Sequence, residues 1–417
     1  MDAFDRWMHT GPPTRPISRR DLLRGAGVGA LGLSLASILA ACSDDGTAGS
    51  SSSAAASPSP LPPIAGELTV AQWPLYIDKS KGRSPSLDMF MKESGIDVDY
   101  RTVINDNQAF FSTLVPLFES GQATNWDITA LSDWVVNLMR QQGWLETLDW
   151  SALPTADETM LEAFRDPAYD PGNAHSVPWQ GGVTGIAYYP DLVPGGKIEA
   201  FADLWNTELA GHVGMLTEMV DTMTLTLLML GVDPQTATLD DAARARDKLL
   251  EQRDQGIVRQ YVGQGYIDDL VSKNNWASMA WSGDVFYYKE LGGAPDLEFV
   301  VPSEGGVIWT GPLQIPVQAE HPADAHAFMD FYYRPEIAAM VTDWVLYMTP
   351  VDGVHDIMLE KAKNLTGADR QYYETLADSP LLFPPEDPAS ANLYEYKAFD
   401  GKEFEEYSAL FQEVVNG

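Results

Sequence analysis

Apolar residues from residue 67 onward follow strand-like and helix-like spacings in turn. Leu68 and Val70 alternate with the polar Thr69, which predicts a strand, and Pro74 ends it because proline cannot donate to a strand ladder. The later segments follow the same pattern, with glycines closing the helices. The predicted elements of this half are the strands 67–73, 96–100 and 126–131 and the helices 84–95, 107–120 and 135–142.

This alternation of strands and helices predicts an α/β protein with a mostly parallel, wound sheet. In such sheets ligands bind outside the carboxyl ends of the strands. Trp73 lies at the carboxyl end of the first strand, and Ser132 and Trp134 follow the third. We therefore expect these two aromatic positions to converge on one edge of the sheet.

The second half continues the alternation and ends in a helix with one apolar face. Asp221 precedes a helix that is apolar on most sides, so it is either the N-cap of that helix or a ligand-binding carboxylate. The predicted elements are the strand pair 176–189, the amphipathic stretch 201–209, the strands 214–217 and 306–309, and the helices 223–230, 240–253, 323–331, 335–345 and 404–414.

A tryptophan followed three residues later by a carboxylate stands in the apolar run 276–290. The face of the Trp281 indole attracts an ammonium group, and Asp284 supplies the opposite charge, so the pair suits an organic cation. Taken by itself, the segment is explained more simply as a strand end followed by a tight turn. The aromatic positions elsewhere in the chain favour the binding interpretation.

Length and charge narrow the classes of protein and ligand. A chain of 417 residues has room for two domains. It carries 26 basic and 60 acidic residues and a formal net charge of -34, which argues against nucleic acid or anionic lipid as a partner of the folded body. Such a surface attracts cations, although acidic residues also serve solubility.

The N-terminus has the form of an export signal. Residues 18–23 (SRRDLL) are a twin-arginine motif, the weakly apolar run 25–41 follows, and 39–42 (LAAC) has the pattern of a bacterial lipobox. We expect residues 1–41 to be a signal peptide and residues 42–66, rich in Ser, Pro and Ala, to be a flexible tether. A membrane-spanning helix is disfavoured because the run is short and rich in glycine.

Cys42 is the one cysteine of the sequence. If it becomes the lipidated first residue, the mature protein has no thiol, which excludes cysteine catalysis and cysteine-ligated metals. The expected location is the outer face of the cytoplasmic membrane, with the folded body anchored through the lipid on Cys42.

Several segments, taken in order, resemble the bacterial spermidine/putrescine-binding proteins, the extracellular solute-binding subunits of polyamine ABC importers. The resemblance covers nearly all of the chain after the tether. The matching segments are 68–76 (LTVAQWPLY), 126–143 (WDITALSDWVVNLMRQQG), 176–186 (SVPWQGGVTGI), 201–205 (FADLW), 280–284 (AWSGD), 305–316 (GGVIWTGPLQIP) and 347–350 (YMTP).

The resemblance implies a two-lobe periplasmic-binding-protein fold, similar to type II, with two hinge crossovers and the ligand in the cleft between the lobes. The crossovers are expected near Gly181–Ile186 and Met279–Trp281. The lobes are then residues 67–183 plus 279–318 (lobe 1) and 184–278 plus 319–417 (lobe 2).

The family lays aromatic rings along the methylenes of the polyamine and places carboxylates at its ammonium groups. Carried over by position, the implied ligand-binding residues are the rings Trp73, Tyr76, Trp134, Trp281 and Trp309, the hydroxyl of Ser132, the carboxylates Glu218, Asp221 and Asp284, and the further rings Tyr266 and Tyr347.

Two positions depart from the family pattern. Many relatives carry an acidic residue two positions after the tryptophan of the segment 305–316, where this chain has Gly311. After Trp73 the family often has polar residues, where this chain has Pro74 and Leu75. Losing one carboxylate weakens the binding of a di- or tri-cation by about 1 to 3 kcal/mol, so a shorter or singly charged ligand is also compatible with the sequence.

Two other functions compete with amine binding. A two-lobe ferric-ion-binding protein would use adjacent tyrosines, and the chain has four such doublets, but an iron site would leave Trp73, Trp134 and Trp309 without a role. An exported enzyme is disfavoured because no G-x-S-x-G, H-E-x-x-H or glycine-rich nucleotide fingerprint follows the tether and the six histidines lack metal-ligand spacing. We expect no catalytic residue, no metal and no cofactor.

The expected partners are a small organic cation of the polyamine class and the permease subunits of an ABC transporter. A small amine, betaine or ferric ion is the alternative ligand. Nucleic acid is not expected as a partner, and the protein is expected to be a monomer.

Overall fold

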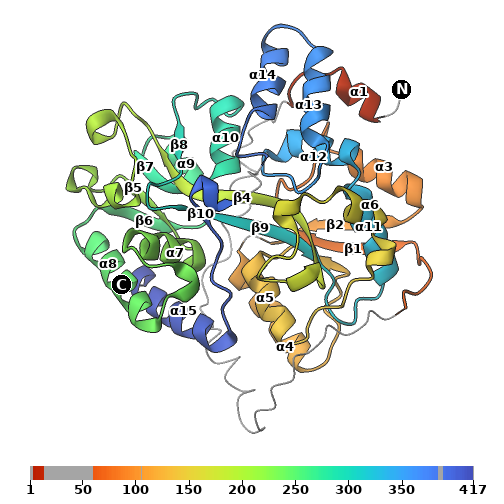
Figure 1. The fold of residues 1–417 in the computed structure, drawn as a ribbon, viewed down its shortest axis with the longest axis horizontal. Coiled ribbons are helices and arrows are strands. Elements are labelled where there is room, and N and C mark those ends of the chain that lie inside the picture. The colour runs from red at the N-terminus through yellow and green to blue at the C-terminus, as the bar shows by residue number, and fades with distance from the viewer. Residues whose placement is uncertain (1–2, 14–59, 105, 384–387, 417) are drawn as a thin grey trace. The chain divides into compact units, whose positions relative to one another are not determined.

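A computed structural model describes residues 3–13, 60–104, 106–383 and 388–416 (Figure 1). The twin-arginine motif, Cys42 and most of the expected tether therefore lie outside the described residues. None of the described helices combines the length and apolarity that a membrane span needs.

The chain forms two compact units. Of the described residues, unit 1 contains 3–13, 60–181 and 310–383, and unit 2 contains 182–309 and 388–416. Strands β4 (Ser176–Tyr188) and β9 (Gly306–Gln314) pass from one unit into the other.

This division differs from the expected lobes at the second crossover. The first change of unit, after Gly181, is two residues from the expected one, but the next follows Trp309 rather than Met279–Trp281. Strand β7 (Ala277–Trp281) pairs with the end of β4 in unit 2, with Thr184 opposite Trp281. Residues 319–383, expected in lobe 2, belong to unit 1, where α11 (Pro322–Tyr332) packs on α3 and β1.

Unit 1 begins with a wound parallel sheet in the order β2-β1-β3. The chain crosses from β1 through α3 to β2 and back through α4 to β3, and α3 and α4 lie on opposite sides of these strands (Figure 1). The elements are β1 (Glu67–Gln72), α3 (Pro85–Ser94), β2 (Asp97–Thr102), α4 (Asn107–Glu119), β3 (Ile128–Thr129) and α5 (Asp133–Gln141).

The end signals of α3 act as the sequence predicts. The Ser84 side chain accepts a hydrogen bond from the Leu87 N–H at 3.2 Å, and Pro85 fills the first turn, where no N–H is needed. Gly95 closes the helix at φ 76°, a left-handed conformation that favours glycine.

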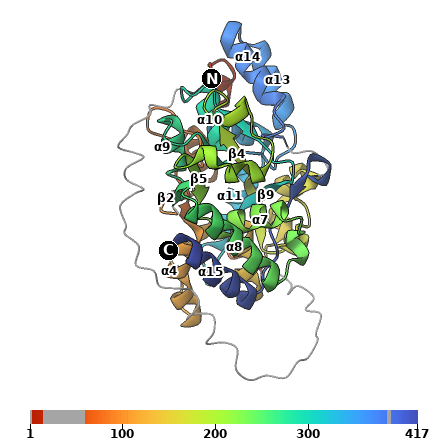
Figure 2. The same ribbon diagram turned by 90° about the vertical axis from the view of Figure 1, so that its left-hand side faces the viewer.

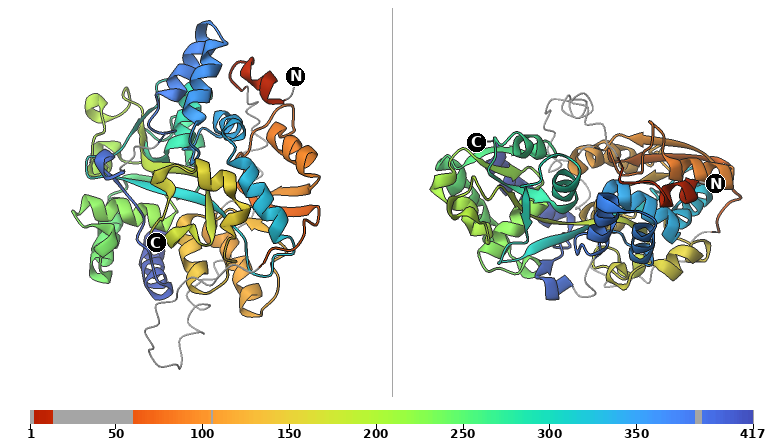
Figure 3. Two further views of the ribbon diagram at one scale, coloured as in Figure 1. Left: turned by 45° about the vertical axis from the view of Figure 1, so that its right-hand side comes forward. Right: turned by 90° about the horizontal axis from the view of Figure 1, so that it is seen from above.

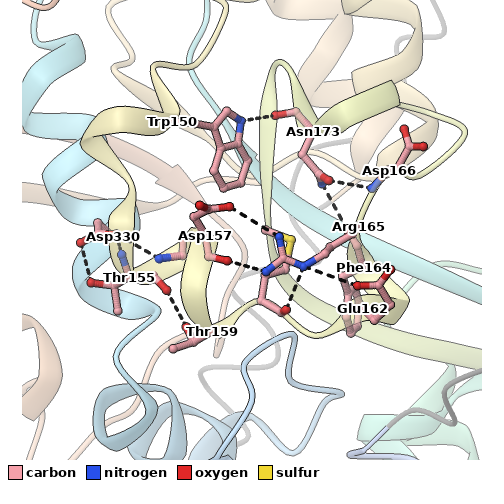
Figure 4. A network of polar contacts seen from close by, with 12 residues as sticks. Trp150, Thr155, Asp157, Thr159, Glu162, Phe164, Arg165, Asp166, Asn173 and Asp330 are labelled. Carbon is pink, nitrogen blue, oxygen red and sulfur yellow. Dashed lines mark hydrogen bonds and ion pairs between the residues drawn. The ribbon is translucent and has the colours of Figure 1, made fainter.

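Residues 142–175 contain only short helical segments, among them α6 (Pro154–Thr159), and polar contacts hold their path (Figure 4). Arg165 donates to a backbone carbonyl of α6 at 2.5 Å, and the Asn173 amide donates to the Phe164 carbonyl at 3.2 Å. Asp330 on α11 accepts from the Thr155 N–H at 2.7 Å. These contacts fix the segment that leads into β4.

Four further helices complete unit 1 in the described chain. The sequence predicts the first two, and α12 has the predicted bounds, whereas the last two are missed. They are α11 (Pro322–Tyr332), α12 (Pro335–Val345), α13 (Val354–Lys363) and α14 (Gly367–Ala377). The N-terminal helix α1 (Ala3–Met8) packs against α12 and α3.

Unit 2 is a mixed sheet with strands β4, β7, β5 and β6 side by side. β5 is parallel to β6 and β7, and β4 is antiparallel to β7 and β8. The elements that complete it are β5 (Val213–Leu216), α7 (Met219–Met229), α8 (Leu239–Asp254), β6 (Val258–Val262), α9 (Tyr266–Val271), α10 (Ser282–Glu290), β8 (Glu298–Val300), β10 (Leu393–Tyr394) and α15 (Gly401–Val415).

The last helix docks on unit 2 by the apolar face that its sequence predicts. α15 packs against α8 and α7 (Figure 2). Its buried residues are Phe404, Tyr407, Phe411 and Val414, so the i, i+3, i+4 pattern alone locates the contact surface.

Candidate functional site

Three aromatic side chains of unit 1 form a row at the carboxyl end of β1. The Trp73 indole donates to the Ala130 carbonyl at 2.8 Å, which ties the end of β1 to the end of β3. Its ring centroid lies 6.5 Å from that of Tyr76, which lies 5.6 Å from Tyr347. Trp73 and Tyr76 are half-buried and Tyr347 is buried, so the first two rings keep an accessible part.

A tight turn presents Tyr76 beside Trp73. Leu75 takes a φ of 66°, which reverses the chain direction, and its side chain is exposed. The Trp179 indole then donates to the Tyr76 carbonyl at 3.1 Å and holds the turn from β4. The apolar pair Pro74 and Leu75, which departs from the family pattern, thus forms the turn between the two rings.

Ser132 and Trp134 both follow β3, as predicted, but only the first is accessible. Asn107, at the start of α4, donates to the Ser132 hydroxyl at 2.9 Å and accepts from the Ser132 N–H at 3.0 Å, so the hydroxyl has a fixed direction. The Trp134 side chain is only 5% exposed. Asp133 between them accepts from the Thr310 N–H at 2.9 Å and anchors β9.

Gly311 lies directly against the Tyr76 ring. A Cβ atom built there would be 4.0 Å from Tyr76 Cε1 and 3.7 Å from the Gln180 carbonyl oxygen, which are ordinary contact distances. The site therefore has space for a side chain at this position. Steric crowding therefore does not explain why this chain has glycine instead of an acidic residue at position 311.

In unit 2, Trp281, Tyr266 and Asp284 form one hydrogen-bonded cluster. Trp281 ends β7, and its ring meets the Tyr266 ring edge to face, with centroids 5.5 Å apart. The Tyr266 hydroxyl accepts from the Trp281 N–H at 3.1 Å and donates to Asp284 at 2.9 Å. Burial, together with the Asp284 charge, raises the pKa of Tyr266 well above its ordinary value, so the phenol stays a donor that orients the carboxylate.

Asp221 sits beneath the same indole. It is 3% exposed and accepts hydrogen bonds from the Thr184 hydroxyl and from the Tyr396 hydroxyl at 2.7 Å. Burial raises the pKa of Asp221 to about 6, although these hydrogen bonds lower it. The carboxylate is thus occupied by donors within unit 2.

The N-cap alternative for Asp221 is wrong, because Glu218 holds that position. α7 begins at Met219 with Glu218 as its N-cap residue, and Asp221 stands in the first turn. Glu218 is half-buried and follows β5, at the carboxyl edge where Trp281 ends β7. Glu218 and Asp221 therefore stand in two different environments.

Trp309 depends on a glycine in the neighbouring strand. A Cβ atom on Gly182 would lie 2.4 Å from Trp309 Cζ2, so the ring occupies the space that any larger residue at 182 would need. Trp309 is 8% exposed. Close packing of the Trp309 ring against Gly182 therefore fixes the position of this ring.

The structure places eight of the eleven predicted ligand-binding residues in two sets, one in each unit. Set 1 in unit 1 contains Trp73, Tyr76, Ser132 and Tyr347, and set 2 in unit 2 contains Tyr266, Trp281, Asp284 and Asp221. Trp134, Glu218 and Trp309 belong to neither set. The supporting residues that sequence reasoning misses are Asn107, Asp133, Gly182, Thr184 and Tyr396. Only Gly182 carried a local signal, as one of the glycines of the strand pair.

The doublet Tyr332–Tyr333 does not resemble an iron site. Tyr332 and Tyr333 are buried, and the Tyr333 hydroxyl donates to the Pro178 carbonyl at 2.6 Å. Burial raises the pKa of both phenols well above the ordinary value, which disfavours the phenolate that binds ferric ion. Within the described residues no three His, Cys, Asp or Glu side chains are grouped as a metal would require.

Comparison with known proteins identifies the family. The model for Bacterial extracellular solute-binding protein matches residues 86–367, more than half of the chain. Spermidine/putrescine-binding periplasmic protein 1 of Haemophilus influenzae is 28% identical over 328 residues, with 79% of this chain and 84% of the relative covered. Putrescine-binding periplasmic protein PotF of Escherichia coli is 26% identical, with 75% and 83% covered.

The same relationship holds in three dimensions. The Streptococcus pneumoniae spermidine/putrescine ABC transporter substrate-binding protein PotD has 26% sequence identity and a TM-score of 0.66, with 84% of this chain and 98% of that chain covered. The α/β fold is therefore that of periplasmic binding proteins, as the sequence predicts. The chain belongs to the family of bacterial extracellular solute-binding proteins, which is not a class of enzymes.

Proposed function

We propose that this protein captures a polyamine-like organic cation with sets 1 and 2 and delivers it to an ABC importer. Set 2 carries the proposal, because Trp281 offers a ring face and Asp284 offers a carboxylate within one hydrogen-bonded cluster. Two relatives are named for the ligands they bind, spermidine and putrescine in one and putrescine in the other, and this supports the ligand class. The net charge of -34 favours the approach of a cation.

The mechanism follows from placing binding groups in two units. A ligand that contacts both sets at once stabilises the conformation in which both contacts are made, at the expense of all others. That ligand-bound form would be the one recognised by the permease. The proposal needs a single protein molecule, no cofactor and no metal.

Calorimetric titration tests the ligand class. Ligand-stripped protein is titrated with spermidine, putrescine, γ-aminobutyrate, glycine betaine and ferric citrate. We expect binding of a di- or polyamine, and a protein that binds ferric citrate while giving no heat with any amine would overturn the proposal.

A pair of tryptophan variants locates the site. Trp281→Ala should weaken amine binding by about 1 to 3 kcal/mol. Trp276→Ala is the matched control, because Trp276 immediately precedes β7 and stacks on His212 with centroids 3.8 Å apart. Equal losses in the two variants would mean that the effect is structural.

The N-terminal expectations form part of the proposal. Residues 1–41 act as a twin-arginine signal peptide, Cys42 receives the lipid, and the body is held at the outer face of the cytoplasmic membrane. Mass spectrometry of the membrane fraction should find a diacylglyceryl group on Cys42. Cys42→Ala should release the protein from membranes, and Arg19→Lys combined with Arg20→Lys should keep it in the cytoplasm.

A further inference from the structure

Helix α1 packs on unit 1 through one tryptophan. The Trp7 indole N–H donates to Asp343 Oδ2 at 2.7 Å. Lys361 Nζ lies 3.7 Å from the Trp7 ring centroid and donates to the Trp7 carbonyl. α1 lies beside the antiparallel pair α13 and α14 (Figure 3). One residue of α1 thus makes a hydrogen bond, a cation–π contact and a backbone contact at the same place.

The receiving groups come from three successive helices. Asp343 on α12 is 3% exposed, Lys361 on α13 is fully buried, and their charged atoms are 3.9 Å apart. The Tyr373 hydroxyl on α14 donates to Asp343 at 2.9 Å, and the Tyr373 ring lies 4.6 Å from Lys361 Nζ. A fully buried ammonium group is costly unless it is paired, and Trp7 supplies two of its contacts.

The rest of the segment also follows a defined path. The Phe4 and Trp7 rings stack with centroids 5.6 Å apart. A Cβ atom on Gly11 would lie 2.6 Å from Asp369 Oδ2, so the chain passes close to the Asp369 side chain of α14. α1 also contacts α3, which is distant in sequence from the other helices.

We propose that Asp343, Lys361 and Tyr373 form a docking site for a tryptophan-bearing peptide, and that residues 3–11 of the same chain occupy it. The ligand class is a peptide with an indole donor for Asp343 and a backbone carbonyl for Lys361. The site uses no residue of set 1 or set 2. Because it combines α12, α13 and α14 with a contact to α3, it exists only after unit 1 has folded.

A consequence rests on the proposed export signal. If residues 1–41 are removed on export, the segment leaves and the Asp343–Lys361 pair loses its cover. Docking is then present only in the chain that is folded and still carries residues 1–41. It is absent from the unfolded chain and from the processed chain. The docking itself does not depend on the identity of the transported ligand.

Hydrogen exchange on the full chain tests the docking. The protein is purified from the cytoplasm of cells that lack twin-arginine export, so that residues 3–11 remain attached. Trp7→Ala should speed amide exchange in residues 3–11 at least ten-fold and leave unit 1 outside α12, α13 and α14 unchanged. His9→Ala, a substitution of an exposed residue on the same segment, is the matched control and should have no effect.

Two further variants separate the contacts. Trp7→Phe keeps a ring for Lys361 but loses the donor to Asp343, so its exchange should fall between those of the wild type and Trp7→Ala. A synthetic peptide of residues 1–13 should bind the Trp7→Ala chain saturably, and the same peptide with Trp7→Ala should bind at least ten-fold more weakly. Unchanged exchange in Trp7→Ala, or equal binding of the two peptides, would overturn the proposal.

Failure of this proposal is distinguishable from failure of the amine-binding proposal. Amine titration of the Trp7→Ala chain should give the wild-type affinity, because the docking site shares no residue with sets 1 and 2. A chain that binds amines but does not protect residues 3–11 refutes the docking alone.

Discussion

Replacing Asp221 by asparagine should remove a pH-dependent part of the stability of unit 2. Asp221 is 3% exposed, and its pKa in the folded protein is raised by burial to about 6, from an ordinary value of 3.8. At about 1.4 kcal/mol per pH unit, this gap corresponds to about 3 kcal/mol. Asparagine cannot ionise, so the variant lacks the effect.

The sign follows from the protons bound in each state. Because the folded pKa is the higher one, the folded protein binds more protons than the unfolded chain between about pH 4 and 6. The stabilising contribution of Asp221 is fully present below pH 3.8 and is lost as the pH rises through about 6. The free energy of unfolding of the wild type minus that of Asp221→Asn should therefore fall by about 2 to 2.5 kcal/mol from pH 4 to pH 7.

Urea unfolding followed by circular dichroism at pH 4, 5, 6 and 7 measures this difference. Taking the difference between the two proteins cancels the titration of all other groups, and any constant cost of the amide does not vary with pH. Asp240→Asn, on the exposed surface of α8, should show no such slope relative to the wild type. A wild-type minus Asp221→Asn difference that stays level from pH 4 to pH 7 would refute the assignment of a buried, proton-binding carboxyl beneath Trp281.

Three other substitutions test the site. Asp284→Asn keeps an acceptor for the Tyr266 hydroxyl but removes the charge, so amine affinity measured by titration should fall by about 1.5 to 3 kcal/mol with little change in urea stability. Gly311→Asp adds a carboxylate at a position where the Cβ atom meets Tyr76 and Gln180 only at ordinary contact distances, and should strengthen diamine binding about ten-fold; weaker binding would contradict this interpretation of the site. Gly182→Ala forces the Trp309 ring to move and should cost about 1 to 3 kcal/mol of stability, whereas wild-type stability would contradict the close packing.

Local signals in the sequence predict much of the fold. The N-cap Ser84, the stop at Gly95 and the apolar face of α15 act within a few residues of the chain, and each is found where its pattern places it. The second crossover is different. Residues 279–281 end in unit 2 because β7 pairs with β4, almost a hundred residues away, and no short-range pattern encodes that pairing.

In the candidate site, too, some residues follow from local signals and others depend on contacts between distant segments. Trp73 and Ser132 are located by the rule that ligands bind at the carboxyl ends of strands, which needs only the order of the elements. Trp134 satisfies the same rule but is buried, since side chains in a helical first turn point in different directions. The two hydroxyl donors to Asp221, Thr184 and Tyr396, come from separate segments of unit 2, so only the folded chain reveals that this carboxylate is occupied.

The discontinuous make-up of the two units has a consequence for the order of synthesis and folding. Unit 1 needs residues up to α14, and unit 2 needs α15 to cover α7 and α8. The chain emerges from the ribosome with its N-terminus first. Neither unit can therefore complete its fold before its late segments, α11 to α14 in unit 1 and α15 in unit 2, have emerged with the last quarter of the sequence.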